Sequence, residues 1–87
     1  MKILAEPIDA LVIYNKKQKP IPCRFKLIDT DGVRRDIKVD KVLNIEETKL
    51  GGMRNFIYSC QSLIGNEQKR YELKYIVNEY RWELYKM

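Results

Sequence analysis

The side chains that most enzymes use for catalysis are scarce in this chain of 87 residues. It contains no histidine, which is the commonest general base and the commonest metal ligand. Its two cysteines, Cys23 and Cys60, are too few for a zinc site, which needs about four ligands. Each lies in an alternating apolar stretch, which favours a buried free thiol. The serines Ser59 and Ser62 have no base at a recognisable catalytic spacing. The sequence therefore predicts no catalytic residue, no metal site and no cofactor, and favours a protein that is not an enzyme.

Two glycine-containing motifs fall short of known ligand loops. The segment 29–32 (Asp-Thr-Asp-Gly) has part of a calcium-loop pattern, but Leu27 and Lys38 stand where further oxygen ligands are needed. The pair Gly51-Gly52 belongs to neither of the glycine patterns that cradle phosphates. Both motifs instead predict turns between strands, because Asp-Gly and Gly-Gly readily adopt the positive φ angles of tight hairpins.

Positive charge is the feature of the composition that points to a ligand. The chain has 17 lysine and arginine residues against 12 aspartate and glutamate residues, which gives a formal net charge of +5 and a pI of about 9.3. Basic side chains of this kind neutralise nucleic-acid phosphates, so nucleic acid is the favoured partner. The candidate phosphate-binding residues are Lys16, Lys17, Lys19, Arg34, Arg35, Lys49 and Arg54.

Further outward-facing positions could extend this basic face across two predicted strands, namely Arg24, Lys26 and Lys38. Four aspartates lie among them, at positions 29, 31, 36 and 40, so charge that only keeps the protein soluble is the alternative interpretation. The aromatic residues least securely assigned to a core are Tyr14, Tyr80 and Tyr85. An exposed tyrosine beside basic residues would stack on a base.

Apolar and polar residues alternate with a period of two, and turn residues interrupt the pattern at regular spacing, which is typical of an antiparallel all-β domain. The predicted strands cover residues 8–14, 21–28, 33–47, 54–64, 70–77 and 82–87. We therefore expect one domain over residues 1–87, with a meander of five to six antiparallel strands that forms a small barrel or a strongly curled sheet. The pattern breaks at Lys41 and Val42, where a bend or bulge is expected.

Residues 67–87 leave an alternative open. Apolar side chains from Leu73 to Met87 also fall at helical spacing, which would give an amphipathic C-terminal helix and an α+β fold. This segment also holds four tyrosines and a tryptophan, which prefer the pleated surface of a sheet. Strands are therefore the favoured prediction.

Three stretches of the C-terminal half are the most distinctive part of the sequence. They are Tyr58-Ser59-Cys60-Gln61-Ser62, Tyr71-Glu72-Leu73-Lys74-Tyr75 and Trp82-Glu83-Leu84-Tyr85-Lys86-Met87. In these stretches the chain resembles short bacterial all-β proteins of unknown function. The resemblance implies an all-β fold, and it implies no activity, cofactor or site residue.

The sequence contains no run of about 18 apolar residues that could span a membrane. Near the N-terminus, Glu6 and Pro7 interrupt the apolar residues, so the segment does not fit the apolar region of a secretory signal. We therefore expect a cytoplasmic protein without a membrane partner.

A second hypothesis for function is a protein–protein adaptor or a homodimer. Either would pair an exposed edge strand of the sheet with another chain. The strand at 8–14 is the expected edge, because both of its faces are apolar apart from Asp9.

Overall fold

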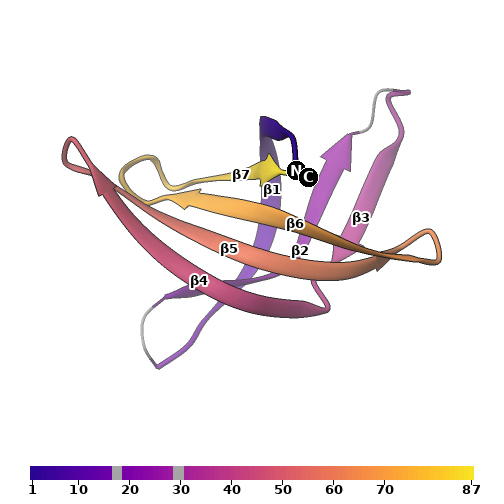
Figure 1. Ribbon diagram of the computed structural model, residues 1–87, viewed down its shortest axis with the longest axis horizontal. Helices are drawn as coiled ribbons and strands as arrows, with labels where there is room; N and C mark the ends of the chain where they lie inside the picture. The colour runs from indigo at the N-terminus through magenta and orange to yellow at the C-terminus, as the bar shows by residue number, and fades with distance from the viewer. Residues whose placement is uncertain (17–18, 29–30) are drawn as a thin grey trace.

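The computed structural model describes residues 1–16, 19–28 and 31–87 and contains one antiparallel sheet of seven strands (Figure 1). The strands are β1 (Ile3–Tyr14), β2 (Pro20–Ile28), β3 (Arg34–Lys38), β4 (Lys41–Leu50), β5 (Met53–Ile64), β6 (Glu67–Ile76) and β7 (Arg81–Lys86). A short 3-10 helix, η1 (Val77–Glu79), joins β6 to β7. The prediction of an all-β fold built on a curled antiparallel sheet is confirmed.

The strands lie in the order β3-β2-β1-β7-β6-β5-β4. The first and last strands of the chain therefore pair in the middle of the sheet, and β3 and β4 form its two edges. Hydrogen bonds between the ends of the chain extend the central pairing. The Lys2 amide donates to the Met87 carbonyl at 2.8 Å, and the Met87 amide donates to the Lys2 carbonyl at 3.0 Å.

The sheet curls into a half-barrel because its two edges meet where β3 runs into β4. The Val39 amide donates to the carbonyl of Cys23 on β2 at 2.9 Å, and the next amide, that of Asp40, donates to the carbonyl of Gln61 on β5 at 3.1 Å. The Ser62 hydroxyl donates to the Lys38 carbonyl at 2.6 Å. These bonds fasten the β1–β3 meander over the β4–β7 meander at this corner (Figure 1).

Alternate residues of β5, β6 and β7 build an aromatic core on the concave face, as the sequence pattern predicts. Their buried side chains include Phe56, Tyr58, Cys60, Tyr71, Leu73, Tyr75, Trp82 and Leu84. The Trp82 ring centroid lies 5.1 Å from that of Tyr58 and 4.9 Å from that of Tyr75. From the other meander, Phe25 packs against Tyr71 with centroids 5.4 Å apart. Edge and tilted contacts of this kind stabilise aromatic clusters beyond simple burial.

The buried hydroxyl groups of Tyr58, Ser62 and Tyr71 bind backbone of the opposite meander or one another. The Tyr58 hydroxyl donates to the Pro20 carbonyl, and the hydroxyls of Ser62 and Tyr71 share a hydrogen bond. Burial raises the pKa of Tyr58 and raises the pKa of Tyr71 to about 12. Cys23 and Cys60 are free thiols, and burial raises the pKa of Cys60 to about 12.

The prediction that residues 33–47 form one continuous strand is wrong. These residues are divided between β3 and β4, which lie at opposite edges of the sheet. The alternation continues through the break because Ile37 is buried and Val39 is half-buried, so the pattern does not reveal that the chain changes neighbours there. The expected irregularity in this region is a bulge at Leu43, between Val42, paired with Cys60, and Asn44, paired with Ser59.

The alternative helix at 67–87 is also wrong. Residues of β6 are buried alternately at Tyr71, Leu73 and Tyr75, a period of two that only a strand can bury on one face. A two-residue turn at Gly65 and Asn66, with φ of 55° and 67°, forces the chain back along β5. The hydrophobic residues at helical spacing are thus shared among β6, η1 and β7.

The expectation that residues 8–14 form an edge strand is wrong as well. They belong to β1, which pairs with β2 on one side and with β7 on the other. The apolar residues of its second face remain exposed, with Leu11 at 64% and Ile13 at 61%. β1 is therefore an interior strand that forms hydrogen bonds along both of its edges. One of its two apolar faces is nevertheless exposed to solvent.

The predicted turn at Gly51 and Gly52 is present between β4 and β5, with φ of 56° and 80°. The calcium-like segment 29–32 falls partly outside the described residues, since only its last two positions are described. In the described part of the chain, no helix is long and apolar enough to cross a membrane.

Candidate nucleic-acid interface

Three of the candidate basic residues come together where the β4–β5 turn meets the start of β2. Lys49 and Arg54 lie opposite each other across the β4–β5 hairpin. Lys19 precedes β2, and its Nζ lies 5.6 Å from the centroid of the Phe56 ring. The guanidinium carbon of Arg54 lies 5.2 Å from the same centroid. Two cations from distant parts of the sequence thus share one aromatic ring.

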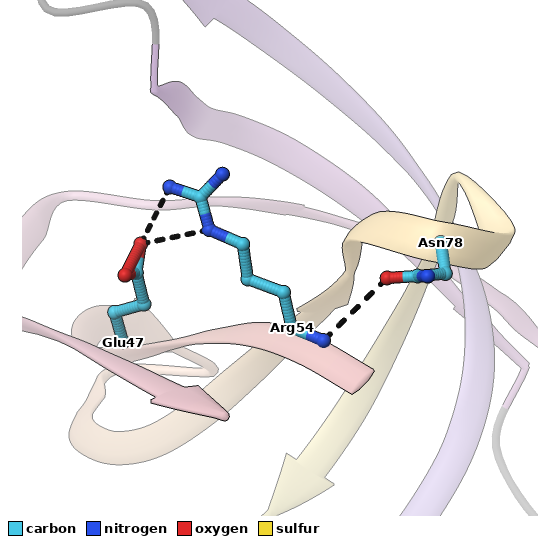
Figure 2. A network of polar contacts seen from close by, with 3 residues as sticks. All are labelled: Glu47, Arg54 and Asn78. Atoms are coloured by element: carbon cyan, nitrogen blue, oxygen red, sulfur yellow. Dashed lines mark hydrogen bonds and ion pairs between the residues drawn. The ribbon is translucent and has the colours of Figure 1, made fainter. Parts of the chain in front are cut away.

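A single carboxylate lies among these cations. The Arg54 side chain donates to Glu47 Oε1 from Nε at 3.0 Å and from Nη2 at 2.7 Å (Figure 2). The hydrogen bond from Arg54, together with the positive charges of Arg54, Lys19 and Lys49, holds the pKa of Glu47 below its ordinary value. Three positive groups therefore surround one negative group, and the site keeps a positive surplus.

A pocket of about 320 Å³ opens beside these side chains. Its walls are Tyr14, Lys19, Pro20, Arg54, Phe56, Tyr75 and Val77. Tyr14, at the end of β1, is 64% exposed, while Phe56 and Tyr75 belong to the core. Burial, and then the neighbouring Tyr14 hydroxyl, raise the pKa of Tyr75. The pocket thus combines two cations with one accessible aromatic ring.

A second exposed tyrosine lies next to this pocket. Tyr80 is 85% exposed, and its backbone amide donates at 3.3 Å to the carbonyl of Val77, a wall residue of the pocket. We call the whole group the basic-aromatic end of the molecule. It comprises Tyr14, Lys19, Lys49, Arg54, Phe56, Tyr75 and Tyr80.

Backbone and ring contacts connect the basic-aromatic end to the rest of the fold. The Arg54 amide donates to Asn78 Oδ1 at 3.5 Å, which connects the start of β5 to η1 (Figure 2). Phe56 contacts Tyr58 edge-on, with centroids 6.4 Å apart. Because Tyr58 lies in the centre of the aromatic core, the pocket wall is continuous with the most buried part of the protein.

Among the remaining candidates, Arg34 and Arg35 lie elsewhere in the fold. Lys16 is exposed two residues after Tyr14, and Lys17 lies outside the described residues. Arg34 and Arg35 are exposed on β3, whose start lies on the opposite side of the molecule from the β4–β5 turn (Figure 1). Arg34 lines a separate pocket that also contains Glu6 and Asp9. Arg34 and Arg35 thus form a group separate from Lys19, Lys49 and Arg54.

The residues predicted to extend the basic face lie near Arg34 and Arg35, on β2 and β3. Arg24, Lys26 and Lys38 are exposed on β2 and β3, where Arg24 Nη1 lies 3.5 Å from Asp36 Oδ2. Acidic residues therefore alternate with basic ones on this face. Tyr85, the third tyrosine left open by the sequence, is half-buried, and its ring centroid lies 4.8 Å from Lys74 Nζ.

Sequence reasoning missed two members of the basic-aromatic end and the carboxylate beside it. Phe56 and Tyr75 belong to the core pattern, and nothing in that pattern shows that they also form a pocket wall. Glu47 is the last residue of the predicted strand at 33–47, and the sequence pattern gives no sign of its ion pair. Its position opposite Phe56 in the β4–β5 pairing follows from the Gly51-Gly52 turn, so this turn is the signal that could have linked Glu47 with Arg54.

Comparison of the chain with protein-family models, with curated proteins and with solved structures finds no match. Across residues 1–16, 19–28 and 31–87, no cluster of three or more Cys, Asp or Glu side chains could hold a metal ion. The geometry and charge of the basic-aromatic end are therefore the basis for a functional proposal.

Proposed function

We propose that the protein is a non-enzymatic, cytoplasmic module that binds nucleic acid through the basic-aromatic end. The observation that carries this proposal is the convergence of Lys19, Lys49 and Arg54 on one carboxylate beside an exposed tyrosine. Cations placed together keep a site positive, which favours a polyanion. Aromatic side chains next to such cations are the usual platform for bases of a nucleic acid strand.

The mechanism is phosphate neutralisation combined with base stacking. Lys19, Lys49 and Arg54 would bind successive phosphates, and Arg54 would exchange its bond with Glu47 for one with a phosphate. Tyr14, exposed on the same pocket, would stack on a base. Lys16 and Lys17, which precede Lys19 in the sequence, would add further phosphate contacts. Arg34 and Arg35 are on another face, and the proposal does not depend on them.

The test is fluorescence anisotropy of labelled DNA and RNA oligonucleotides. If three phosphates of a single strand are neutralised, affinity should fall about 20-fold between about 50 mM and about 200 mM salt. The variant Lys19→Glu plus Lys49→Glu should weaken binding strongly and flatten this salt dependence. Lys69→Glu plus Arg70→Glu is the matched control, because it also reverses two charges, on exposed residues of β6 near the β5–β6 turn at the far end of the sheet (Figure 1).

Wild-type protein that binds no oligonucleotide at the lower salt concentration would refute the proposal. Equal loss of affinity in the control variant and in the variant of Lys19 and Lys49 would show that only the overall charge matters, and would remove the basic-aromatic end as the site.

The cytoplasmic part of the proposal is supported by the state of the cysteines. Both are free thiols, and free thiols persist in reducing compartments, whereas small secreted domains depend on disulfides. Cell fractionation of a tagged protein would test this, and recovery from an extracellular fraction would contradict it.

A second candidate function is an adaptor or homodimer that pairs through an edge strand. The observation in its favour is that β4, with ten residues, pairs only with β5 among the described strands. An edge of this length is a template for a further strand. Sedimentation at several protein concentrations tests the homodimer. A monomer at every concentration would exclude that form of the hypothesis.

A further inference from the structure

We propose that Tyr80 is a base-stacking residue and that it makes the site selective for single-stranded over duplex nucleic acid. The inference rests on the proposed function and specifies its ligand. Its starting point is the unusual backbone of Tyr80, which ends η1 with φ of 51° and ψ of 42°.

The left-handed conformation of Tyr80 is unfavourable for a bulky side chain. Two other non-glycine residues in the described part of the chain have positive φ, and they are Ala5 and Asn66. Alanine is small, and asparagine tolerates this region through its short polar side chain. Glycine or asparagine would therefore complete the turn between η1 and β7 with less strain than tyrosine does.

The ring of Tyr80 contributes no packing that could offset this strain. At 85% exposure, it is the most exposed large apolar side chain among residues 1–16, 19–28 and 31–87. Its backbone amide closes the turn by donating to the Val77 carbonyl at 3.3 Å, a bond that any residue other than proline could make. A strained residue whose side chain has no role in the fold indicates a role in binding.

The surroundings of Tyr80 identify the ligand that its ring would meet. The Val77 carbonyl that its amide binds belongs to a wall residue of the pocket that also contains Tyr14, Lys19 and Arg54. The exposed ring of Tyr14 thus lines a positively charged pocket, and the exposed Tyr80 ends the turn that begins at the pocket residue Val77. This arrangement suits a strand whose bases lie on aromatic rings while its phosphates follow the cations.

Duplex DNA cannot use these rings in the same way. Its bases are already stacked and paired, so a tyrosine at the surface can reach their faces only if the duplex is distorted, at a cost in free energy. The cations would still attract the phosphates of a duplex. The ring of Tyr80 should therefore contribute to single-strand affinity and contribute little to duplex affinity.

The experiment compares Tyr80→Asn, which removes the ring and fits the left-handed backbone, with Tyr80→Phe, which keeps the ring. Anisotropy titrations use a labelled thymidine oligonucleotide and a blunt duplex of mixed sequence. Tyr80→Asn should lower single-strand affinity about tenfold and leave duplex affinity within about twofold of wild type. Tyr80→Phe should keep wild-type affinity for both.

Thermal unfolding of the same variants excludes damage to the fold as the cause. Relief of backbone strain in Tyr80→Asn should raise the midpoint by about 4 °C. Lower single-strand affinity in a more stable protein is a combination that a merely structural role cannot produce.

The possible failures are distinguishable. If wild-type protein binds neither probe, the proposed function and this inference both fail. If binding depends on Lys19 and Lys49 but Tyr80→Asn leaves single-strand affinity unchanged, or weakens single-strand and duplex binding equally, only the role of Tyr80 is refuted.

Discussion

Arg54 and Glu47 form an ion pair that a phosphate can replace. Both side chains are partly exposed, at 46% and 40%, and exposed pairs of this kind contribute little net stability because water screens them. Both hydrogen bonds from Arg54 end on the same carboxylate oxygen. Glu47 thus occupies the position that a phosphate oxygen would take and competes with an anionic ligand for Arg54.

Replacement of Glu47 should therefore strengthen binding. Glu47→Gln removes the competing negative charge, so affinity for a single-stranded oligonucleotide should rise a few fold. Glu46→Gln, a change of the same type at the neighbouring exposed position of β4, is the control and should change affinity less. Weaker binding by Glu47→Gln would mean that Glu47 positions Arg54 for the ligand and does not compete with it.

The same carboxylate should give a pH-dependent contribution to stability. Because the pKa of Glu47 is lowered in the folded protein from an ordinary value of 4.5, its contribution is present above that value and is lost as pH falls through the lowered pKa. Wild type should therefore exceed Glu47→Gln in urea midpoint at neutral pH, and the difference should vanish at the acid end of the series. A difference that is independent of pH would contradict this.

A buried hydroxyl anchors the start of β2 above the aromatic core. The hydrogen bond from Tyr58 to the Pro20 carbonyl satisfies both groups where both residues are buried. Tyr58→Phe should leave the carbonyl unpaired and lower the free energy of unfolding by about 1–3 kcal/mol, measured by urea denaturation. Tyr80→Phe, which alters an exposed ring, should leave the unfolding free energy unchanged. An equally small effect at both positions would show that the bond is not required.

At the level of elements, the tight turns determine which residues meet across each hairpin. Gly52 has φ of 80°, and a Cβ added there would meet nothing within 4 Å. Gly52→Ala should therefore cost about 1 kcal/mol from backbone strain alone, measured by urea denaturation. Gly52→Asn should cost less because asparagine tolerates positive φ. If alanine and asparagine have the same effect, the cause is not the backbone conformation.

Local pattern was sufficient to predict most strands, because strands such as β5 and β6 bury alternate residues. The face of β5 that carries Phe56 and Tyr58 could be predicted from alternation alone, as could the turn at Gly51 and Gly52. The order of the strands could not, since alternation describes faces and contains no information on neighbours. For this reason the break at Val39 and the interior position of β1 were missed.

The same limit explains what could be predicted of the candidate site. Lys49 and Arg54 face each other because of a local turn, and this pairing is accessible from the sequence. Lys19 joins them only because the β1–β2 hairpin folds over β5, which is a consequence of the curl of the whole sheet. The left-handed conformation of Tyr80 depends on the turn after η1. It could not be predicted from the sequence, because tyrosine rarely adopts this conformation.

At the scale of the whole molecule, the curl of one sheet encloses a core that contains titratable groups. Burial raises the pKa of Cys60 from 9.0 to about 12 and that of Tyr71 from 10.0 to about 12. The unfolded chain therefore releases these protons first as pH rises. Stability linked to these groups is complete below pH 9 and is lost progressively toward pH 12.

This linkage can be measured by urea denaturation over that alkaline range. The unfolding free energy of wild type should fall more steeply with pH than that of Cys60→Ala, which lacks the thiol. The slopes with pH are compared, because the alanine variant also loses packing at every pH. Identical slopes would show that the Cys60 thiol does not titrate differently in the folded and unfolded states.

The half-barrel separates two groups of basic residues, one at the basic-aromatic end and one around Arg34 and Arg35, where acidic residues lie among them. The central claim is that the first of these is the binding surface. The most direct test is a titration of ¹⁵N-labelled protein with a thymidine oligonucleotide, followed by amide chemical shifts. We expect the largest shifts at Tyr14, Lys19, Lys49, Arg54 and Tyr80. Shifts confined to β2 and β3 around Arg34, or no shifts at low salt, would contradict the account.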